Sequence, residues 1–293
     1  MAGHSTAIAA WTHGEATVNG VRLHYVEAGS GPLVLLLHGF PEFWYSWRHQ
    51  IPVLAAAGYH VVAPDMRGYN TSAKPRGVRS YALEPLTGDV LGLIRHFGAE
   101  RATVVGHDWG GAVAWYVPMR YPDAVERLIV LNAPHPAALM RELHTLDQLR
   151  RSWYVFVFQI PWLPEAAVRA RGYAMLDRTL RTDPARPDAF SDDDIRRYKR
   201  ALAQPGALTA AINYYRAAFR RDPRTATRDL RPITCPTLLI WGERDRYLSP
   251  RLTEGLDRWV PNLRVERIPD ASHWVQNDTP ARVNELILSF LRQ

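Results

Sequence analysis

The sequence predicts an α/β fold in which a mostly parallel, doubly wound sheet carries an inserted helical cap. Short apolar, β-branched runs alternate with longer helical patterns in the first half of the chain and again near its end, as in parallel strands joined by crossover helices. Between these parts, residues 136–231 lose the strand pattern and are rich in alanine, arginine and aromatic residues at helical spacing. With 293 residues, 47% of them hydrophobic, the chain can bury one large core and hold such an insertion.

The expected strands are the short apolar runs. Residues 16–19 and 21–28 form a predicted hairpin, because Asn19-Gly20 between them favours a tight two-residue turn. Buried strands are expected at residues 33–37, 60–63, 103–106, 128–131, 237–241 and 263–268.

The expected helices fill the spaces between the strands. We predict them at residues 46–57, 83–97, 111–120, 251–259 and 281–291. The predicted organisation is therefore a core domain of residues 1–135 and 232–293, interrupted by a helical cap of residues 136–231.

The positive net charge first suggests a nucleic-acid partner. The net charge is +7, and lysine occurs only at Lys74 and Lys199, which leaves 34 of the 36 basic residues as arginine. These arginines are scattered among acidic residues and form no basic block with interleaved aromatic residues. A solvated surface is the better interpretation, and we expect no nucleic-acid partner.

The composition also bears on the cellular compartment of the protein and on whether it needs a cofactor. Cys235 is the only cysteine and cannot form an internal disulfide, which favours a reducing compartment. Residues 1–11 contain no basic cluster followed by a long apolar run, and no run approaches the ~20 apolar residues that cross a bilayer. We expect a cytoplasmic protein without a membrane partner. No cluster of His and Cys residues suggests a metal, and we expect no metal and no organic cofactor.

One aspartate lies where a nucleophile is expected. Asp108 is the centre of Gly-His-Asp-Trp-Gly-Gly, residues 106–111, at the end of a predicted strand and the start of a helix. Small residues on both sides permit the tight strand-to-helix turn that presents a nucleophile, and the helix N-terminus favours an ionised carboxylate. The alternative is an ordinary helix-capping aspartate. The match of six positions in this context favours the nucleophile.

A carboxylate nucleophile restricts the reaction. Attack on an acyl carbon would form an anhydride, whereas attack on a saturated carbon forms an ordinary ester. Asp108 therefore indicates displacement at an sp³ carbon, followed by hydrolysis of the ester. That second step needs a base and an oxyanion site for the carbonyl group of Asp108 itself.

The oxyanion site is expected where His38-Gly39-Phe40-Pro41 follows the strand at residues 33–37. Ligands of doubly wound folds gather at this sheet edge. The backbone N–H groups of Phe40 and Trp109 are the expected donors. We further expect His38, Pro41 and Trp109 to contact the substrate.

The expected base is His273, in a loop between the last strand and the last helix, and its expected orienting acid is Asp245, after the preceding strand. An aspartate that accepts a hydrogen bond from the imidazole fixes its tautomer and stabilises its charged form. Glu243 is the rival acid, whereas Asn132 is excluded because it carries no charge.

These motifs resemble those of the soluble epoxide hydrolases of the α/β-hydrolase superfamily. The resemblance extends from about Ala16 onward, and the matching segments are residues 38–42, 65–68, 106–111, 132–136, 153–159, 241–245 and 273–278. It implies the α/β-hydrolase fold and conversion of an epoxide to a vicinal diol through an ester on Asp108. It also implies that two cap tyrosines bind the epoxide oxygen, Tyr154 and Tyr215, although Tyr214 is adjacent to the second. A phenol is a neutral proton donor at pH 7, as that role requires.

The nearest alternative is a haloalkane or haloacid dehalogenase, which uses the same aspartate nucleophile. Fluoroacetate-type dehalogenases place arginine where this chain has Trp109 and Ala112, and haloalkane dehalogenases tend to place asparagine where it has Phe40, although they share the Asp-Trp pair. A serine esterase is disfavoured because the turn lacks serine, and a receptor of the same fold that binds without turnover is disfavoured by the complete Asp108, Asp245 and His273 set. The preferred epoxide, the selectivity and the choice between monomer and homodimer stay open.

Overall fold

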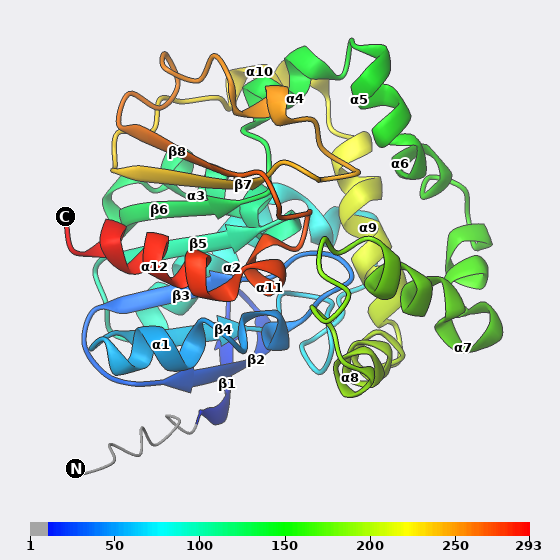
Figure 1. The fold of residues 1–293 in the computed structure, drawn as a ribbon, viewed down its shortest axis with the longest axis horizontal. Coiled ribbons are helices and arrows are strands. Elements are labelled where there is room, and N and C mark those ends of the chain that lie inside the picture. Colours follow the sequence, from blue (N-terminus) through cyan, green and yellow to red (C-terminus); the bar gives the residue numbers. More distant parts are fainter. Residues whose placement is uncertain (1–10) are drawn as a thin grey trace.

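An eight-stranded sheet forms the centre of the molecule, in the order β1-β2-β4-β3-β5-β6-β7-β8 (Figure 1). The structure, a computed structural model, describes residues 11–293 apart from the side chains of Pro223 and Ala226. The prediction that residues 1–11 carry no targeting segment concerns residues that, apart from Trp11, lie outside this range. The strands are β1 (Thr12–Val18), β2 (Val21–Ala28), β3 (Leu33–Leu37), β4 (His60–Pro64), β5 (Ala102–His107), β6 (Val125–Leu131), β7 (Thr237–Gly242) and β8 (Leu263–Ile268).

The sheet is parallel except at one edge. β1 pairs with β2, and β2 with β4, in antiparallel register, and all other neighbours are parallel. Asn19 and Gly20 have φ of 49° and 75°, the left-handed pair that a type I′ hairpin turn requires. β3 and β5 are buried along their whole length because helices cover both faces of the sheet. The predicted α/β class and mostly parallel sheet are confirmed.

Helices lie on both faces of the sheet. α1 (Ile51–Ala56) and α12 (Pro280–Leu291) contact each other on one face, with the short α11 (Val275–Asp278) beside α12. α2 (Leu83–His96) and α3 (Trp109–Arg120) contact each other on the opposite face (Figure 1). Four 3₁₀ turns complete this part: η1 (Trp44–Trp47), η2 (Val78–Tyr81), η3 (Pro122–Ala124) and η4 (Pro250–Thr253).

Two helix predictions need correction. The stretch predicted as a helix at residues 46–57 is divided between η1 and α1. The helix predicted at residues 251–259 is wrong, since only η4 forms there. Glu254 has extended backbone angles and Gly255 has a φ of 68°, so the chain leaves the helical region after one turn.

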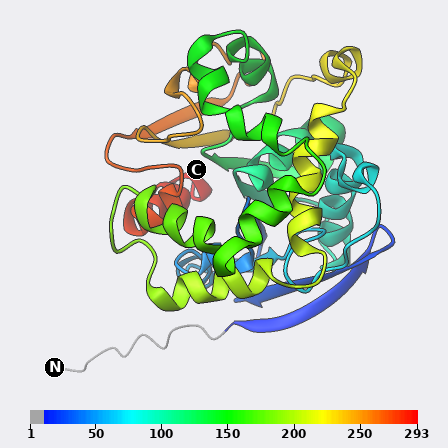
Figure 2. The same cartoon turned by 90° about the vertical axis from the view of Figure 1, so that its right-hand side faces the viewer.

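Seven helices lie between β6 and β7 in the sequence, and among the described residues this insertion contains no strand. They are α4 (Pro136–Glu142), α5 (Leu146–Arg151), α6 (Trp153–Val157), α7 (Leu163–Thr182), α8 (Asp192–Leu202), α9 (Ala207–Phe219) and α10 (Pro223–Arg228). α7 is broken at residues 170–173, where the backbone angles are not helical. α6, α7, α8 and α9 stand beyond the carboxyl ends of the parallel strands, at the right of Figure 1 and facing the viewer in Figure 2. No helix within residues 11–293 is both long and apolar enough to cross a membrane.

Candidate active site

A strained turn presents Asp108 at the carboxyl end of β5. Asp108 has φ 50° and ψ −118° and lies between β5 and the first residue of α3. The turn is tight: a Cβ atom on Gly106 would lie 2.4 Å from the carbonyl oxygen of Gly110, and one on Gly110 would lie 2.1 Å from that of Leu37. Both positions must therefore be glycine. A strained residue held this firmly is typical of a functional site.

The carboxylate of Asp108 has two different oxygens. Oδ1 accepts a hydrogen bond of 2.7 Å from the backbone N–H of Phe40. Oδ2 lies 3.5 Å from Nε2 of His273 and is not held by the backbone. Burial by itself would raise the pKa of Asp108, but the hydrogen bond and charge of His273, with the charge of His107 and the N–H of Phe40, hold the pKa below its ordinary value. Asp108 is therefore ionised at neutral pH.

His273 is held from its other side by Asp245. Nδ1 of His273 donates a 2.7 Å hydrogen bond to Oδ2 of Asp245, which leaves Nε2 facing Asp108. Asp245 is fully engaged: Oδ2 also accepts from the side-chain amide of Asn132, and Oδ1 accepts from the backbone N–H groups of Tyr247 and Leu248. A carboxylate with four donors stays ionised and cannot rotate, so the imidazole is fixed in tautomer and orientation.

The two flanking carboxylates determine the charge of His273. Burial lowers the pKa of His273, but the charges and hydrogen bonds of Asp245 and Asp108 outweigh it, and its pKa lies well above the ordinary value. The imidazole is thus an imidazolium while both carboxylates are charged. Loss of the charge of Asp108 would therefore lower the pKa of His273 again.

A cavity of about 350 Å³ opens above Asp108 and His273. Apart from these two residues and the tyrosines, its wall is almost wholly apolar, and it includes Pro41, Val157, Phe158, Leu176, Leu202 and Trp274. Tyr154 and Tyr215 are both on the wall, with ring centroids 5.8 Å apart. The site thus combines one anion, one imidazolium and these two phenols in an apolar chamber. The ring of a third tyrosine, Tyr247, is also on the wall, but its hydroxyl donates to Asp183.

The two wall tyrosines are neutral. Burial and then the charge of Asp108 raise the pKa of each above its ordinary value, because a phenolate beside a carboxylate in an apolar chamber is unfavourable. Tyr214, the open alternative from the sequence, points elsewhere: its hydroxyl donates a 2.7 Å hydrogen bond to the backbone carbonyl of Arg67. Tyr215 is therefore the tyrosine of this pair that faces the cavity.

The structure brings most of the expected residues together, with two exceptions, His38 and Trp109. Asp108, His273, Tyr154, Tyr215, Phe40 and Pro41 all line the cavity. His38 does not line the cavity, so the expectation that it contacts the substrate is not supported. Its Nε2 accepts from the backbone N–H of Met66 and its Nδ1 lies 2.9 Å from the carbonyl oxygen of Gly39, so the buried ring secures the loop instead.

Trp109 supports the cavity from behind. Its ring packs edge-on against those of Tyr214 and Tyr215, with centroids 5.6 Å and 4.9 Å away, and it is not among the residues that line the chamber. A hydrogen bond from the Trp109 side chain partly opposes the burial that raises the pKa of Tyr215. Its expected contact with the substrate is thus replaced by a contact with a wall tyrosine.

Sequence reasoning missed three contributors. Asn132 was excluded as an acid, but its amide donates to Asp245 and to the carbonyl of Gly242. Its place directly after β6, at the same sheet edge as the other site residues, was the signal. Tyr247 lies on the cavity wall with its ring 5.4 Å from that of His273, two positions after Asp245. Only a known fold could reveal that pairing.

The third contributor is a buried pair beneath the base. Nδ1 of His107 lies 2.7 Å from Oε2 of Glu42, and its Nε2 lies 2.8 Å from the backbone carbonyl oxygen of His273. Burial alone would raise the pKa of Glu42, but His107 and the hydroxyl of Ser46 hold it below its ordinary value. The loop that carries His273 is thereby tied to the core.

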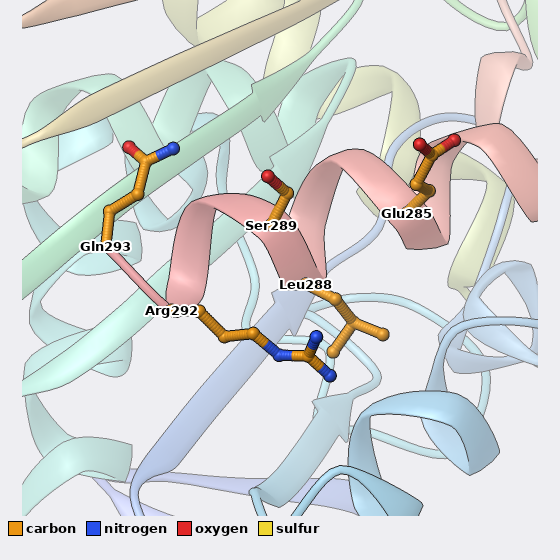
Figure 3. Close-up of a pocket in the computed structure, with 5 residues that line it drawn as sticks. All are labelled: Glu285, Leu288, Ser289, Arg292 and Gln293. Atoms are coloured by element: carbon orange, nitrogen blue, oxygen red, sulfur yellow. The ribbon is translucent and has the colours of Figure 1, made fainter.

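A second hollow beside α12 offers no comparable chemistry. It is lined by Glu285, Leu288, Ser289, Arg292 and Gln293. Figure 3 shows that their polar ends point in different directions and do not converge on one point. The residues that could hold a substrate are those above Asp108. Within the described part of the chain, no three His, Cys, Asp or Glu side chains are grouped as metal ligands would be.

Comparison with known proteins places the chain in a family. A family model described as alpha/beta hydrolase fold matches residues 32–280. The AB hydrolase superfamily protein YfhM of Bacillus subtilis is 46% identical over 280 residues, which cover 94% of this chain and 96% of that protein. Epoxide hydrolase 3 of Xenopus tropicalis is 41% identical over 284 residues, covering 94% and 76%.

Solved structures agree with these relatives. The crystal structure of a variant epoxide hydrolase from Bacillus megaterium has a TM-score of 0.88 and 34% identity, covering 96% of this chain and all of the other. The chain is thus an α/β hydrolase. Within that superfamily, it belongs to the epoxide hydrolase family.

Proposed function

We propose that this protein hydrolyses epoxides to vicinal diols through a covalent ester on Asp108. The observation that carries the proposal is the convergence, in one apolar cavity, of an ionised carboxylate, an imidazole fixed by Asp245, and two neutral tyrosines. Each group matches one requirement of the reaction. The family to which the chain belongs supports the same conclusion.

The first step is ring opening. Oδ2 of Asp108, the oxygen that the backbone does not hold, attacks a saturated ring carbon and displaces the epoxide oxygen. The leaving oxygen would become an alkoxide, and the hydroxyls of Tyr154 and Tyr215 stabilise it and supply a proton. The product is a hydroxyalkyl ester of Asp108.

The second step is hydrolysis of that ester. Alkylation removes the charge of Asp108, which is one cause of the raised pKa of His273, so the imidazolium gives up its proton, and a proton returns to the phenolate that ring opening has left. Neutral His273, still bonded to Asp245, then deprotonates a water that attacks the Asp108 carbonyl carbon. The oxyanion forms on Oδ1, which already faces the N–H of Phe40, and the N–H of Trp109 is the second donor.

The substrate is an epoxide with apolar substituents. The cavity wall offers Pro41 and other apolar side chains around the reacting groups, and an uncompensated charge there would be costly. A similar structure from Bacillus megaterium, 33% identical, holds its product, an aryloxy-propanediol. The dehalogenase alternative is not favoured, because the Xenopus tropicalis relative and the Bacillus megaterium structure are epoxide hydrolases and the phenols of Tyr154 and Tyr215 face the cavity.

The proposal includes the organisation of the chain. Residues 1–135 and 232–293 form the catalytic core and residues 136–231 form a cap that supplies Tyr154 and Tyr215. We further propose a cytoplasmic location, which the single buried cysteine supports, and a monomer or homodimer that needs no cofactor.

A trapped ester tests the mechanism. In His273→Gln, the carboxylate of Asp108 is intact but the water has no base, so incubation with styrene oxide should add the mass of one epoxide to the protein. Peptide mapping should place the added mass on Asp108, and Asp108→Asn should show none. Normal diol production by His273→Gln, or release of halide from a chloroalkane without diol formation from the epoxide, would overturn the proposal.

A further inference from the structure

The positive charge and the exposed apolar side chains of this protein gather on the same segment. Residues 136–231 contain 18 basic and 11 acidic residues, a net charge of +7, whereas the rest of the chain contains 18 of each. The whole net charge therefore lies on one third of the chain. Ten large hydrophobic side chains are exposed among the described residues, and nine of them lie between residues 143 and 219; the tenth is Val265 on β8.

Four of these exposed aromatic side chains and two arginines lie on neighbouring parts of the segment, and we call this set the cap face. It consists of Trp153, Phe156, Trp162 and Phe219 together with Arg169 and Arg220. Phe156 on α6 contacts Phe219 at the end of α9, with ring centroids 5.9 Å apart. Trp162 is 83% exposed and borders a hollow of about 500 Å³ with the two arginines. Figure 2 shows α6, α7 and α9 on the side that faces the viewer.

The arginines of the cap face are available to a partner. Within residues 11–293, Arg169 and Arg220 form no ion pair and no side-chain hydrogen bond, and both are exposed. Neighbouring arginines differ: Arg216 forms a buried pair with Glu165, and Arg181 pairs with Asp177. Exposed apolar patches of this kind mark interaction sites. The two free cations indicate that the partner is negatively charged.

The aromatic and arginine side chains of the cap face favour some classes of partner over others. A second copy of this chain would bring an equally positive face, so charge repulsion opposes association through it. Duplex nucleic acid would satisfy the arginines, but its bases are stacked inside the helix, so it offers no apolar contact to the exposed aromatic side chains of the cap face. Aromatic side chains next to arginine are the composition of surfaces that lie in the headgroup region of anionic bilayers.

We propose that the cap face docks onto a bilayer that contains anionic phospholipid. The aromatic side chains enter the headgroup region and the arginines lie on the phosphates. Trp153, 63% exposed, belongs both to the cap face and to the wall of the cavity above Asp108. Docking therefore places the mouth of an apolar cavity against the phase where apolar epoxides accumulate. This peripheral contact departs from the expectation of no membrane partner, which rested on the lack of an apolar run long enough to span a bilayer.

Vesicle sedimentation tests the proposal without reference to catalysis. The protein should sediment with vesicles of equal parts phosphatidylglycerol and phosphatidylcholine, but not with phosphatidylcholine alone. Binding should be lost in about 1 M salt, where the Debye length is about 3 Å. The double variant Arg169→Gln/Arg220→Gln should bind these vesicles at least about 10-fold more weakly than the wild type. Trp162→Ser/Phe219→Ser should show a similar loss.

Matched controls come from the opposite part of the molecule. Arg95→Gln/Arg292→Gln removes the same charge from two exposed positions on α2 and beyond α12, and Val265→Ser removes the exposed side chain outside the cap. Both should bind vesicles as the wild type does, and all variants should retain thermal midpoint and turnover of a water-soluble epoxide. Equal binding to both vesicle types, loss of binding in the controls, preference for duplex DNA, or dimer formation through the cap face would each overturn the proposal.

Discussion

Two adjacent tyrosines on α9 have separate tasks. Tyr215 faces the cavity beside Tyr154, whereas the fully buried Tyr214 donates to the backbone carbonyl of Arg67. Successive residues of a helix point about 100° apart, so one residue can face the cavity while the next secures the core. The neighbours can therefore serve as each other's controls.

Removal of either cavity phenol should slow ring opening selectively. In Tyr154→Phe and Tyr215→Phe, the alkoxide loses a proton donor, and the alkylation rate in single-turnover measurements should fall about 10²-fold. Hydrolysis of the ester, which these hydroxyls do not serve, should change little. Rapid-mixing measurements of the two phases separate these steps.

Tyr214→Phe is the matched control for this prediction. It removes one buried hydrogen bond and should lower the free energy of unfolding by about 1 kcal/mol. Alkylation should continue at the wild-type rate. A larger effect of Tyr214→Phe than of Tyr215→Phe on alkylation would contradict the assignment.

At the scale of elements, the turn between β5 and α3 determines the position of the nucleophile. Gly110 lies against the carbonyl oxygen of Leu37 at the end of β3, so a neighbouring strand limits the size of this residue. The strained backbone of Asp108 is maintained by this close packing.

Gly110→Ala should therefore damage both stability and activity. The added Cβ would lie 2.1 Å from a backbone oxygen, so β3 and α3 must separate, at a cost of about 3 kcal/mol. Thermal denaturation and diol formation measure the two effects. Gly98→Ala is a suitable comparison, because its Cβ would meet nothing within 4 Å and only its φ of 68° opposes the change. Equal stability of the two variants would show that the turn can relax.

The C-terminal elements show a limit of pattern analysis. The sequence of η4 and the turns after it has apolar residues at helical spacing, yet Glu254 and Gly255 leave the helical region. Val260 and Leu256 are buried all the same, so tertiary packing accounts for the apolar pattern without a helix. The spacing of apolar residues indicates which side chains are buried. It does not distinguish a helix from other backbone conformations that bury the same side chains.

At the scale of the whole molecule, His135 connects stability to pH. It lies between β6 and α4, where the chain leaves the sheet for the cap, and its side chain accepts from the backbone N–H of Ala137. It is fully buried, and burial lowers its pKa from 6.5 to about 3. The folded protein therefore keeps His135 neutral at pH values where the unfolded chain binds a proton.

The free energy of unfolding should fall as the pH falls from about 6.5 towards about 3, by up to about 1.4 kcal/mol per pH unit from this residue. Asparagine can still accept from the N–H of Ala137 but does not titrate. In His135→Asn, the slope in this pH window should therefore be smaller, as chemical denaturation at about pH 7, 6, 5 and 4 would measure. Parallel curves for variant and wild type would show that His135 is protonated in the folded state or contributes nothing.

The sequence by itself determined the α/β class, the strands and the order of Asp108, Asp245 and His273 along the chain, because alternating apolar runs and glycine-flanked turns are local properties. Only the tertiary structure decided which side chains meet. Asn132 lies against Asp245, His38 turns away from the cavity, and Tyr215 but not Tyr214 faces it. These outcomes depend on the direction of each side chain at a shared sheet edge, and residues more than 100 positions apart reach that edge only when the sheet has formed.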